Sequence, residues 1–230
     1  MADEPDRLFP AHVAELRRRT DGALASAGLD GIAIYSGRLR YEFLDDRPYP
    51  FAVNPHFKHW VPVTDAPECF ISYGQGDARP RLCFFQPSDY WHRPPELPPG
   101  KWQDAFDVTI IREPREARAW LGPGTHRVAY IGERADDFAD WGFAATNPAA
   151  LLDPLHYQRA AKTPYELSCM RVASRIGARA HLAARDALRD EPLVSFCMAP
   201  HAPYTVSDRT FERVGMLAEE LDLPIHVHLH

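Results

Sequence analysis

Short apolar runs alternate along this chain with longer segments of helical periodicity, and this alternation limits the folds that it can adopt. Runs rich in β-branched and aromatic residues predict strands at 29–35, 69–73, 81–86, 106–112 and 127–132. Helical spacing and helix-start signals predict helices at 11–27, 113–121, 147–157 and 164–188, with a helical turn at 135–143. Together these elements predict an α/β domain in which helices flank a mixed sheet.

Local signals refine this prediction. Turn residues at 74–80 are expected to join two of the strands into a hairpin. The segment 46–62 is aromatic and interrupted by prolines, which exclude a central strand, so we expect an irregular wall of the domain. Thr-Pro-Tyr-Glu at 163–166 predicts the start of the long helix, with a cap residue, a proline at the first helical position and an acid.

The last forty residues have a different pattern. An apolar run at 193–198 and a second at 225–229 predict two strands, and a helix is expected between them at 208–221. Thr205 and Asp208 have the spacing of a capping box for that helix. This βαβ order predicts parallel strands with a right-handed crossover. Because both of its edges are open, the unit must join another sheet, dimerise or remain poorly ordered.

Composition excludes several classes of protein. The net charge of −6 argues against nucleic-acid and anionic-membrane partners. No run approaches the roughly 18 apolar residues that a membrane span requires. The four cysteines contain no CxxC pair, which favours free thiols in a reducing cytoplasm. We therefore expect a cytoplasmic globular protein.

Histidines mark the first candidate site. In the run 225–230 side chains alternate across the predicted strand, so His226, His228 and His230 share one face and can bind a metal ion together. The alternative is that they are exposed histidines of a strand face. His201 follows the preceding strand at its carboxyl end, where α/β folds place ligand-binding groups, although a hydrogen-bonded loop histidine fits equally well.

Acidic and aromatic clusters supply further candidates. Asp45 and Asp46 are the only tight acidic pair in an apolar setting, and such a pair can share a proton or bind a cation. The alternative, which nearby prolines favour, is side-chain bonding to the backbone of a turn. Tyr90, Trp91 and His92 can line a pocket or cover the core. The sequence contains no phosphate-binding glycine loop, GxSxG elbow, HExxH motif or zinc finger.

Five segments occur in a characteristic order: FLDDRPYPF at 43–51, VNP at 53–55, WVPVT at 60–64, DYWH at 89–92 and KTPYEL at 162–167. In this order they resemble the bacterial Xaa-Pro dipeptidases, the prolidase family that includes the organophosphate acid anhydrolases. The resemblance covers roughly residues 1–185. It implies a creatinase/prolidase-type N-terminal domain that helps the enzyme to dimerise and lends loops to the partner's active site. By this resemblance Asp45 lines the substrate pocket of the opposite subunit, with Trp91 as a second candidate.

The chain also departs from that family. There, two aspartates, a histidine and two glutamates of a C-terminal domain hold two divalent ions, manganese or similar, which activate water. No stretch of this sequence matches those ligand-bearing strands. The departure predicts that the chain has no catalytic residues of its own, holds no ion stoichiometrically and is inactive.

Two further segments are APHAPYTVSD at 199–208 and LPIHVHLH at 223–230. They resemble the amidohydrolase-type deaminases of S-adenosylhomocysteine and methylthioadenosine, which are (β/α) barrels with one zinc or similar ion. This resemblance implies that His228 is a metal ligand and that His201 contacts substrate. It also implies a βαβ fragment of such a barrel, although the family's early HxH ligands, later aspartate and catalytic glutamate are absent.

The sequence thus predicts a chimera of three parts. These are a prolidase-type N-terminal domain at 1–163, a connecting amphipathic helix at 164–190 and an amidohydrolase-like βαβ fragment at 191–230. We expect a homodimer, and a dipeptide substrate only for the full-length family. Two alternatives remain open: a fragment of a metal-dependent deaminase, and a non-catalytic interaction module.

Overall fold

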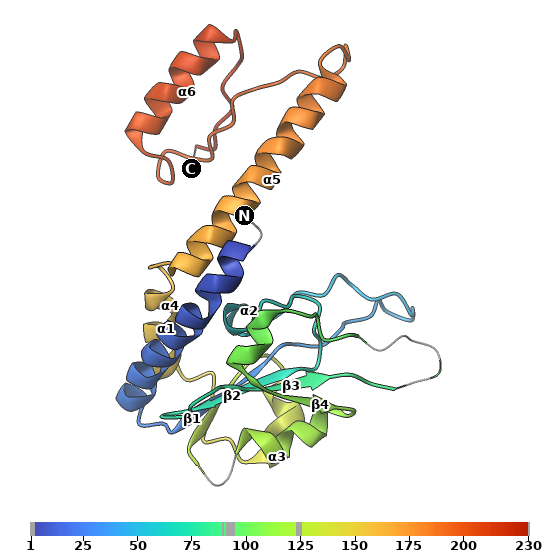
Figure 1. Cartoon of the computed structure of the whole chain (residues 1–230). Helices are drawn as coiled ribbons and strands as arrows, with labels where there is room; N and C mark the ends of the chain where they lie inside the picture. Colours follow the sequence, from blue (N-terminus) through green and yellow to red (C-terminus); the bar gives the residue numbers. More distant parts are fainter. Residues whose placement is uncertain (1–2, 89, 91–94, 123–125, 230) are drawn as a thin grey trace. The chain divides into compact units, whose positions relative to one another are not determined.

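The structure is a computed structural model that describes residues 3–88, 90, 95–122 and 126–229 (Figure 1). It divides into two compact units, Met1–Cys169 and Met170–His230. The first unit contains a six-stranded sheet with helices on both of its faces. Among the helices that the structure describes, none has the length and apolarity that crossing a bilayer requires.

The sheet confirms the predicted mixed arrangement. Its strands lie in the order β4 (Asp107–Ile111), β3 (Arg81–Phe85), β2 (Phe70–Gly74), β1 (Gly31–Tyr35), β5 (Val128–Ile131) and β6 (Ala145–Thr146). The β2–β3 pair is antiparallel, as the predicted hairpin requires, and β1 also pairs antiparallel with β2. The pairs β1–β5, β3–β4 and β5–β6 are parallel. Five of the six strands coincide with predicted ones, and the two-residue β6 is new.

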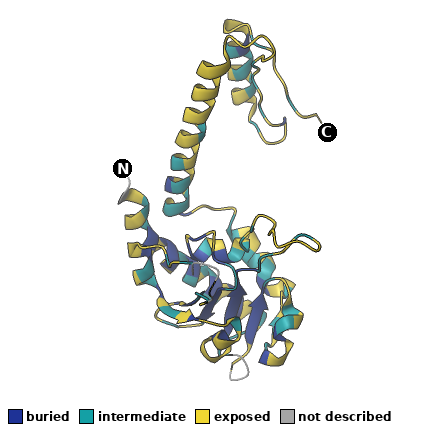
Figure 2. Cartoon of the chain, turned by 90° about the vertical axis from the view of Figure 1, so that its right-hand side faces the viewer, coloured by how far each residue is buried: buried dark blue, intermediate teal, exposed yellow. Residues whose placement is uncertain are grey.

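Two hydrophobic cores cover the two faces of the sheet. All five residues of β1 are buried, because alternate side chains enter opposite cores. Ile32 and Ile34 join the first core, whereas Ala33 and Tyr35 join the second. Figure 2 shows the strands as the buried layer between the helices.

Different helices cover each core. The first core contains residues of α1 (Asp3–Ala27), α2 (Pro55–Trp60), α4 (Ala149–Gln158) and the 3-10 helix η1 (Lys101–Ala105). The second core contains residues of η2 (Pro114–Ala117), α3 (Arg118–Leu121) and η3 (Ala135–Trp141). Helices therefore flank the sheet on both sides, as the sequence predicts.

The first helix is longer than predicted. It begins at Asp3 instead of residue 11 and passes through Pro10. A proline inside a helix removes one backbone hydrogen bond. Here the neighbouring Phe9 is 2% exposed and packs in the first core, so its burial offsets the lost bond. Ser168 Oγ donates a 3.1 Å hydrogen bond to Glu4 in the first turn, which anchors the added residues.

Residues 38–62 are more ordered than the predicted irregular wall. An antiparallel bridge joins Tyr41 to Pro48 and closes a small hairpin. Within this segment α2 begins at Pro55, and its cap residue Asn54 accepts a hydrogen bond from the backbone N–H of His56. Asn followed by Pro is a favourable helix start, and Phe57 and Trp60 then bury against the sheet. The prediction of irregular structure was wrong at this point.

The two later helices begin at different kinds of cap. At α5 (Pro164–Leu188) the Thr163 N–H donates to the Glu166 carboxylate at 2.8 Å, and the Glu166 N–H donates to Thr163 Oγ1 at 3.3 Å. This reciprocal pair confirms the predicted helix start. At α6 (Asp208–Glu220) the cap is Ser207, whose Oγ accepts from the Thr210 N–H at 3.4 Å. The predicted capping box of Thr205 and Asp208 does not form.

The predicted strands at 193–198 and 225–229 do not form. A single parallel bridge between Met198 and Ile225 remains, and α6 lies between them in the sequence. A strand needs neighbours that bury its apolar side chains, and Leu193 is 92% exposed. Among the described residues of the second unit, Ala202 and Ala218 are the only buried hydrophobic ones. The unit therefore lacks the core that would complete its sheet.

Candidate functional site

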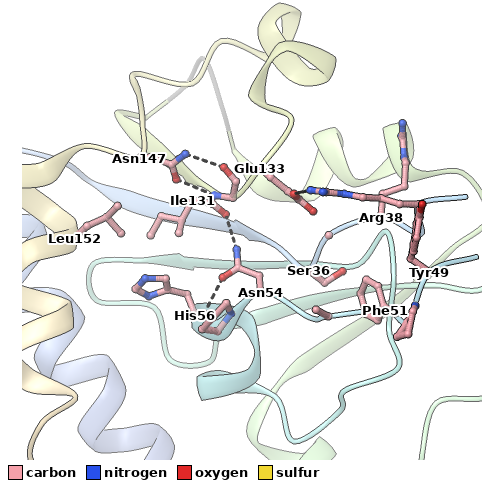
Figure 3. A pocket seen from close by; sticks show the side chains of 16 residues that line it. Ser36, Arg38, Tyr49, Phe51, Asn54, His56, Ile131, Glu133, Asn147 and Leu152 are labelled. Atoms are coloured by element: carbon pink, nitrogen blue, oxygen red, sulfur yellow. Dashed lines mark hydrogen bonds and ion pairs between the residues drawn. The ribbon is translucent and has the colours of Figure 1, made fainter. Parts of the chain in front are cut away.

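A pocket of about 640 Å³ opens where β1 and β5 end (Figure 3). Its wall combines residues that follow β1, residues that follow β5 and the segment that leads into α2. The carboxyl ends of adjacent parallel strands are a favoured place for ligands in α/β sheets. The side chains that give the pocket its polar character are Ser36, Arg38, Arg40, Tyr49, Asn54, His56, Glu133 and Asn147.

Asn54 joins the parts of this pocket. Its Nδ2 donates to the carbonyl oxygens of Tyr35 at 2.9 Å and Ile131 at 3.5 Å, the last residues of β1 and β5. Its Oδ1 accepts from the His56 N–H at 2.9 Å, which starts α2 (Figure 3). One amide thus fixes two strand ends and a helix start. This arrangement holds the wall of the pocket in a defined geometry.

A second asparagine closes the turn after β5. Asn147 Oδ1 accepts from the Gly132 N–H at 2.9 Å, and its Nδ2 donates to the Gly132 carbonyl at 2.7 Å. Gly132 has φ +157°, and an added Cβ would lie 3.0 Å from the side chains of Tyr35 and Tyr130. The position therefore requires glycine.

Charged pairs hold the other side of the pocket. Arg40 pairs with Glu133 at its rim, and Arg38 pairs with Glu68 and, at 3.2 Å, with Asp137. The Tyr35 hydroxyl donates to the Glu68 carboxylate at 2.6 Å. Burial, followed by the carboxylate of Glu68, raises the pKa of Tyr35 well above its usual value, so the phenol stays protonated and continues to donate.

Two histidines meet beside the pocket. The Nε2 atoms of His56 and His156 lie 3.0 Å apart, and their ring centroids are separated by 5.0 Å. Burial, the Arg159 guanidinium and the His156 ring lower the pKa of His56 to about 4. Its imidazole is therefore neutral at pH 7. One ring nitrogen of the pair must carry the shared proton and the other must accept it.

Asp45 lies apart from this pocket, at the tip of the hairpin around Tyr41 and Pro48. It is exposed, and its Oδ1 accepts from the Arg47 N–H at 2.9 Å. The preceding residue Leu44 has φ +59°, and the turn leaves Phe43 and Leu44 90% and 92% exposed. The turn interpretation of the acidic pair is confirmed for Asp45. A role in substrate binding remains a prediction.

His201 and His228 both belong to the second unit. His201 Nδ1 lies 2.9 Å from Thr205 Oγ1, so it is a hydrogen-bonded loop histidine. The His228 ring centroid is 5.6 Å from that of His201 and 6.4 Å from that of His226. Across the described parts of the chain, no group of three or more His, Cys, Asp or Glu side chains could hold a metal ion. Their roles as substrate contact and metal ligand therefore remain predictions.

Other candidates have less structural support. His230, Trp91 and His92 lie outside the described residues, and Tyr90 is 89% exposed. In contrast, sequence reasoning missed Asn54, His56 and Asn147 as site residues. For Asn54 a signal was present, because Asn-Pro is a typical helix start. His56 and Asn147 carry no local signal, since each depends on a partner that only the folded chain supplies.

Comparisons with known proteins agree with this fold. A family profile described as "Xaa-Pro dipeptidase, N-terminal domain" matches residues 7–157. The chain is 42% identical over 188 residues to the Xaa-Pro dipeptidase of Shewanella frigidimarina, a match that covers 82% of this chain and 43% of that protein. It is 46% identical over 182 residues to the Xaa-Pro dipeptidase of Xanthomonas campestris, covering 79% and 41%. The chain therefore spans less than half the length of these relatives.

Solved structures give a more distant likeness. The low-pH form of aminopeptidase P from Escherichia coli is 18% identical, with a TM-score of 0.47, and the match covers 72% of this chain and 43% of that one. A zinc-substituted form of the same enzyme in complex with product gives the same values.

Proposed function

Because the chain belongs to the family of Xaa-Pro dipeptidase N-terminal domains, we propose that it is the accessory domain of a hydrolase that cleaves Xaa-Pro dipeptides. The observation that carries this proposal is the family match over residues 7–157. Those residues include the whole sheet and nearly all of both cores. A folded accessory domain can position loops without performing chemistry itself.

The residues that the structure describes do not fit a two-metal centre. Activation of water between two ions requires several carboxylate and imidazole ligands that converge on one place. No such group of three occurs among the described residues. We therefore assign no hydrolytic step to this chain. We propose that the manganese of the prolidase family binds in the part of such enzymes that this chain does not match.

The hairpin that carries Asp45 is the part we propose to reach a substrate, in the active site of a second copy. Its tip is held by the Asp45–Arg47 hydrogen bond and by the positive φ of Leu44, so the carboxylate has a fixed position. Phe43 and Leu44 are apolar and exposed, and exposed apolar side chains are common on surfaces that a partner protein covers. Both features support a homodimer in which the hairpin crosses to the partner.

The first experiment tests whether the chain alone is active. Purified protein is incubated with Mn²⁺ and an Ala-Pro dipeptide, and release of proline is compared with a chelator-treated sample. We expect equal rates in the two samples. Metal-dependent release that co-purifies with the chain through two different columns would overturn the proposal.

The second experiment tests the role of Asp45. Residues 1–163 replace the N-terminal domain of the Xanthomonas campestris relative, and Asp45→Asn is compared with Asp46→Asn in that chimera. We expect Asp45→Asn to lower kcat/KM by at least about tenfold, equivalent to about 1.4 kcal/mol of transition-state binding. Asp46→Asn is expected to stay within about twofold, since only Asp45 is assigned to the substrate. Equal activity of both variants and the parent chimera would contradict the assignment.

The remaining residues support a more limited proposal. The segment 191–230 lies beyond the family match, and in it α6 lies between the two residues of the Met198–Ile225 bridge. We propose that it is a fragment that requires further strands, as the deaminase-like resemblance implies. The four free cysteines also support a reducing compartment such as the cytoplasm.

A further inference from the structure

The histidine pair beside the pocket connects two elements far apart in the sequence. His56 lies in the first turn of α2, and His156 lies in the last turn of α4. The Asn54 carboxamide fixes the backbone of His56. His156 is exposed and His56 also lines the pocket, so solutes can reach the pair. In Figure 3 the pocket-lining residues Leu152 of α4 and His56 lie on the same side of the pocket.

The spacing of the two nitrogens has a second chemical use. Imidazole nitrogens bind transition metals at about 2.0–2.1 Å. Two such nitrogens at right angles around one ion are about 2.9 Å apart, whereas a tetrahedral arrangement separates them by about 3.3 Å. The observed Nε2–Nε2 distance is 3.0 Å. Both arrangements lie within a few tenths of an ångström of this spacing, so the pair can hold one ion with a small turn of either ring. Among divalent first-row metals, Ni²⁺ and Cu²⁺ bind nitrogen ligands tightly.

We propose that His56 and His156 form a two-histidine site for a transition-metal ion of the Ni²⁺ or Cu²⁺ type. Since the described chain offers no third His, Cys, Asp or Glu at this place, water or a small ligand completes the coordination. On binding, the shared proton leaves to solvent and both rings turn their Nε2 lone pairs toward the ion, which lies to one side of the line between the two nitrogens. This site belongs to the accessory domain itself and does not depend on the dipeptidase role proposed above.

One neighbouring charge opposes the ion. The Arg159 guanidinium acts on His56 strongly enough to contribute to its lowered pKa. The same repulsion disfavours a bound cation. Replacing Arg159 by an uncharged residue should therefore tighten metal binding. If His56 and His156 only share a proton and bind no ion, this replacement should leave the affinity for the metal unchanged.

The test is calorimetric titration with Ni²⁺ at pH 7.5. All samples carry His226→Ala, His228→Ala and His230→Ala, because the alternating histidines near the end of the sequence can also bind the ion. Within this tail variant we compare His56→Ala, His156→Ala and Arg159→Gln. The matched control is His181→Ala, which removes an exposed histidine from α5. Circular dichroism checks that each variant is folded, and the exposed His156 is the change least expected to disturb packing.

The proposal predicts one equivalent of Ni²⁺ bound by the tail variant and by the His181→Ala control. His56→Ala and His156→Ala should each weaken binding by more than about tenfold, and Arg159→Gln should strengthen it severalfold. Ni²⁺ should also broaden the ring NMR signals of both histidines and raise Tm only where both are present. Binding that is unchanged in both alanine variants, or no binding by the tail variant, would overturn the proposal.

Discussion

The His12 Nδ1 atom lies 2.8 Å from the hydroxyl oxygen of Thr163, a residue 151 positions later in the chain. The other ring nitrogen of His12, Nε2, donates to the His59 carbonyl at 2.9 Å, so Nδ1 must accept the Thr163 proton. Thr163 is also the cap residue of α5. A buried imidazole therefore connects α1 and α2 to the start of α5.

Replacing Thr163 should destabilise the first unit. Thr163→Val keeps the shape of the side chain but leaves His12 Nδ1 buried without a partner and removes the cap of α5. We expect a loss of about 2 kcal/mol or more in the free energy of unfolding. Urea titration measures it, with Thr163→Ser as the control that retains the hydroxyl. Equal losses in the two variants would show that the hydroxyl is unimportant.

Stability of the first unit should fall in acid. Burial lowers the pKa of His12, and it lowers those of His56 and His59 to about 4. Between pH 6.5 and about 4 the unfolded chain binds more protons than the folded one at these sites, so the free energy of unfolding decreases as the pH falls. We expect a loss of about 1–3 kcal/mol for each of His56 and His59, discounted for partial exposure, and a further loss from His12 in the same direction.

Protonation of Glu166 also decreases the free energy of unfolding as the pH falls, at a lower pH than the histidines. Burial alone would raise its pKa, but the Thr163 N–H and the rings of His59 and His12 hold the pKa below its usual value. Urea unfolding from pH 7.5 to 4 checks the combined effect, and His59→Gln should flatten the curve while His181→Gln should not. A curve of equal slope in all three proteins would contradict this explanation.

Two phenylalanines provide a matched test of the core. Phe57 on α2 is fully buried, whereas Phe43 at the hairpin tip is 90% exposed. Phe57→Ala should lower the free energy of unfolding by about 3–5 kcal/mol, because it removes buried apolar atoms and leaves a cavity. Phe43→Ala should change the free energy of unfolding by less than about 0.5 kcal/mol. Similar losses at both positions would mean that the hairpin tip packs within the isolated chain.

The second unit should be the first part to be cleaved by protease. Its described residues include only two buried hydrophobic side chains, both alanines, and protection from local opening depends on such burial. Limited proteolysis followed by mass measurement should cut within 189–230 before it cuts the sheet of the first unit. Early cleavage within β1 to β5 would contradict this order.

Local pattern explains which elements could be predicted from the sequence. The main strands of the first unit and the start of α5 follow from short apolar runs and a Thr-Pro-x-Glu cap, signals contained in a few neighbouring residues. Helix α2 was not predicted, because the prolines of its segment argue against regular structure. Asn54 followed by Pro55 is nevertheless a typical helix start. The apolar runs 193–198 and 225–229 were misleading, because an apolar run becomes a strand only where other strands and helices bury it.

The pocket could not be predicted for a related reason. Asn54 bonds to Ile131, 77 residues away, and His56 meets His156 across 100 residues. Such pairs arise from the topology that places the ends of β1 and β5 side by side. Asp45, in contrast, was found through a motif, and its turn geometry follows from its immediate neighbours.

The central strand β1 has no solvent-facing residue, and this restricts how the protein can vary. Inserting or deleting one residue there would exchange the occupants of the two cores, placing Tyr35 among the side chains that normally surround Ile34. In a strand with one solvent-facing side, half of the positions can be substituted with little loss of packing, whereas each of the four side chains of β1 packs in one of the two cores. Insertions and deletions among relatives of this chain are therefore expected in its loops and not within the five residues of β1.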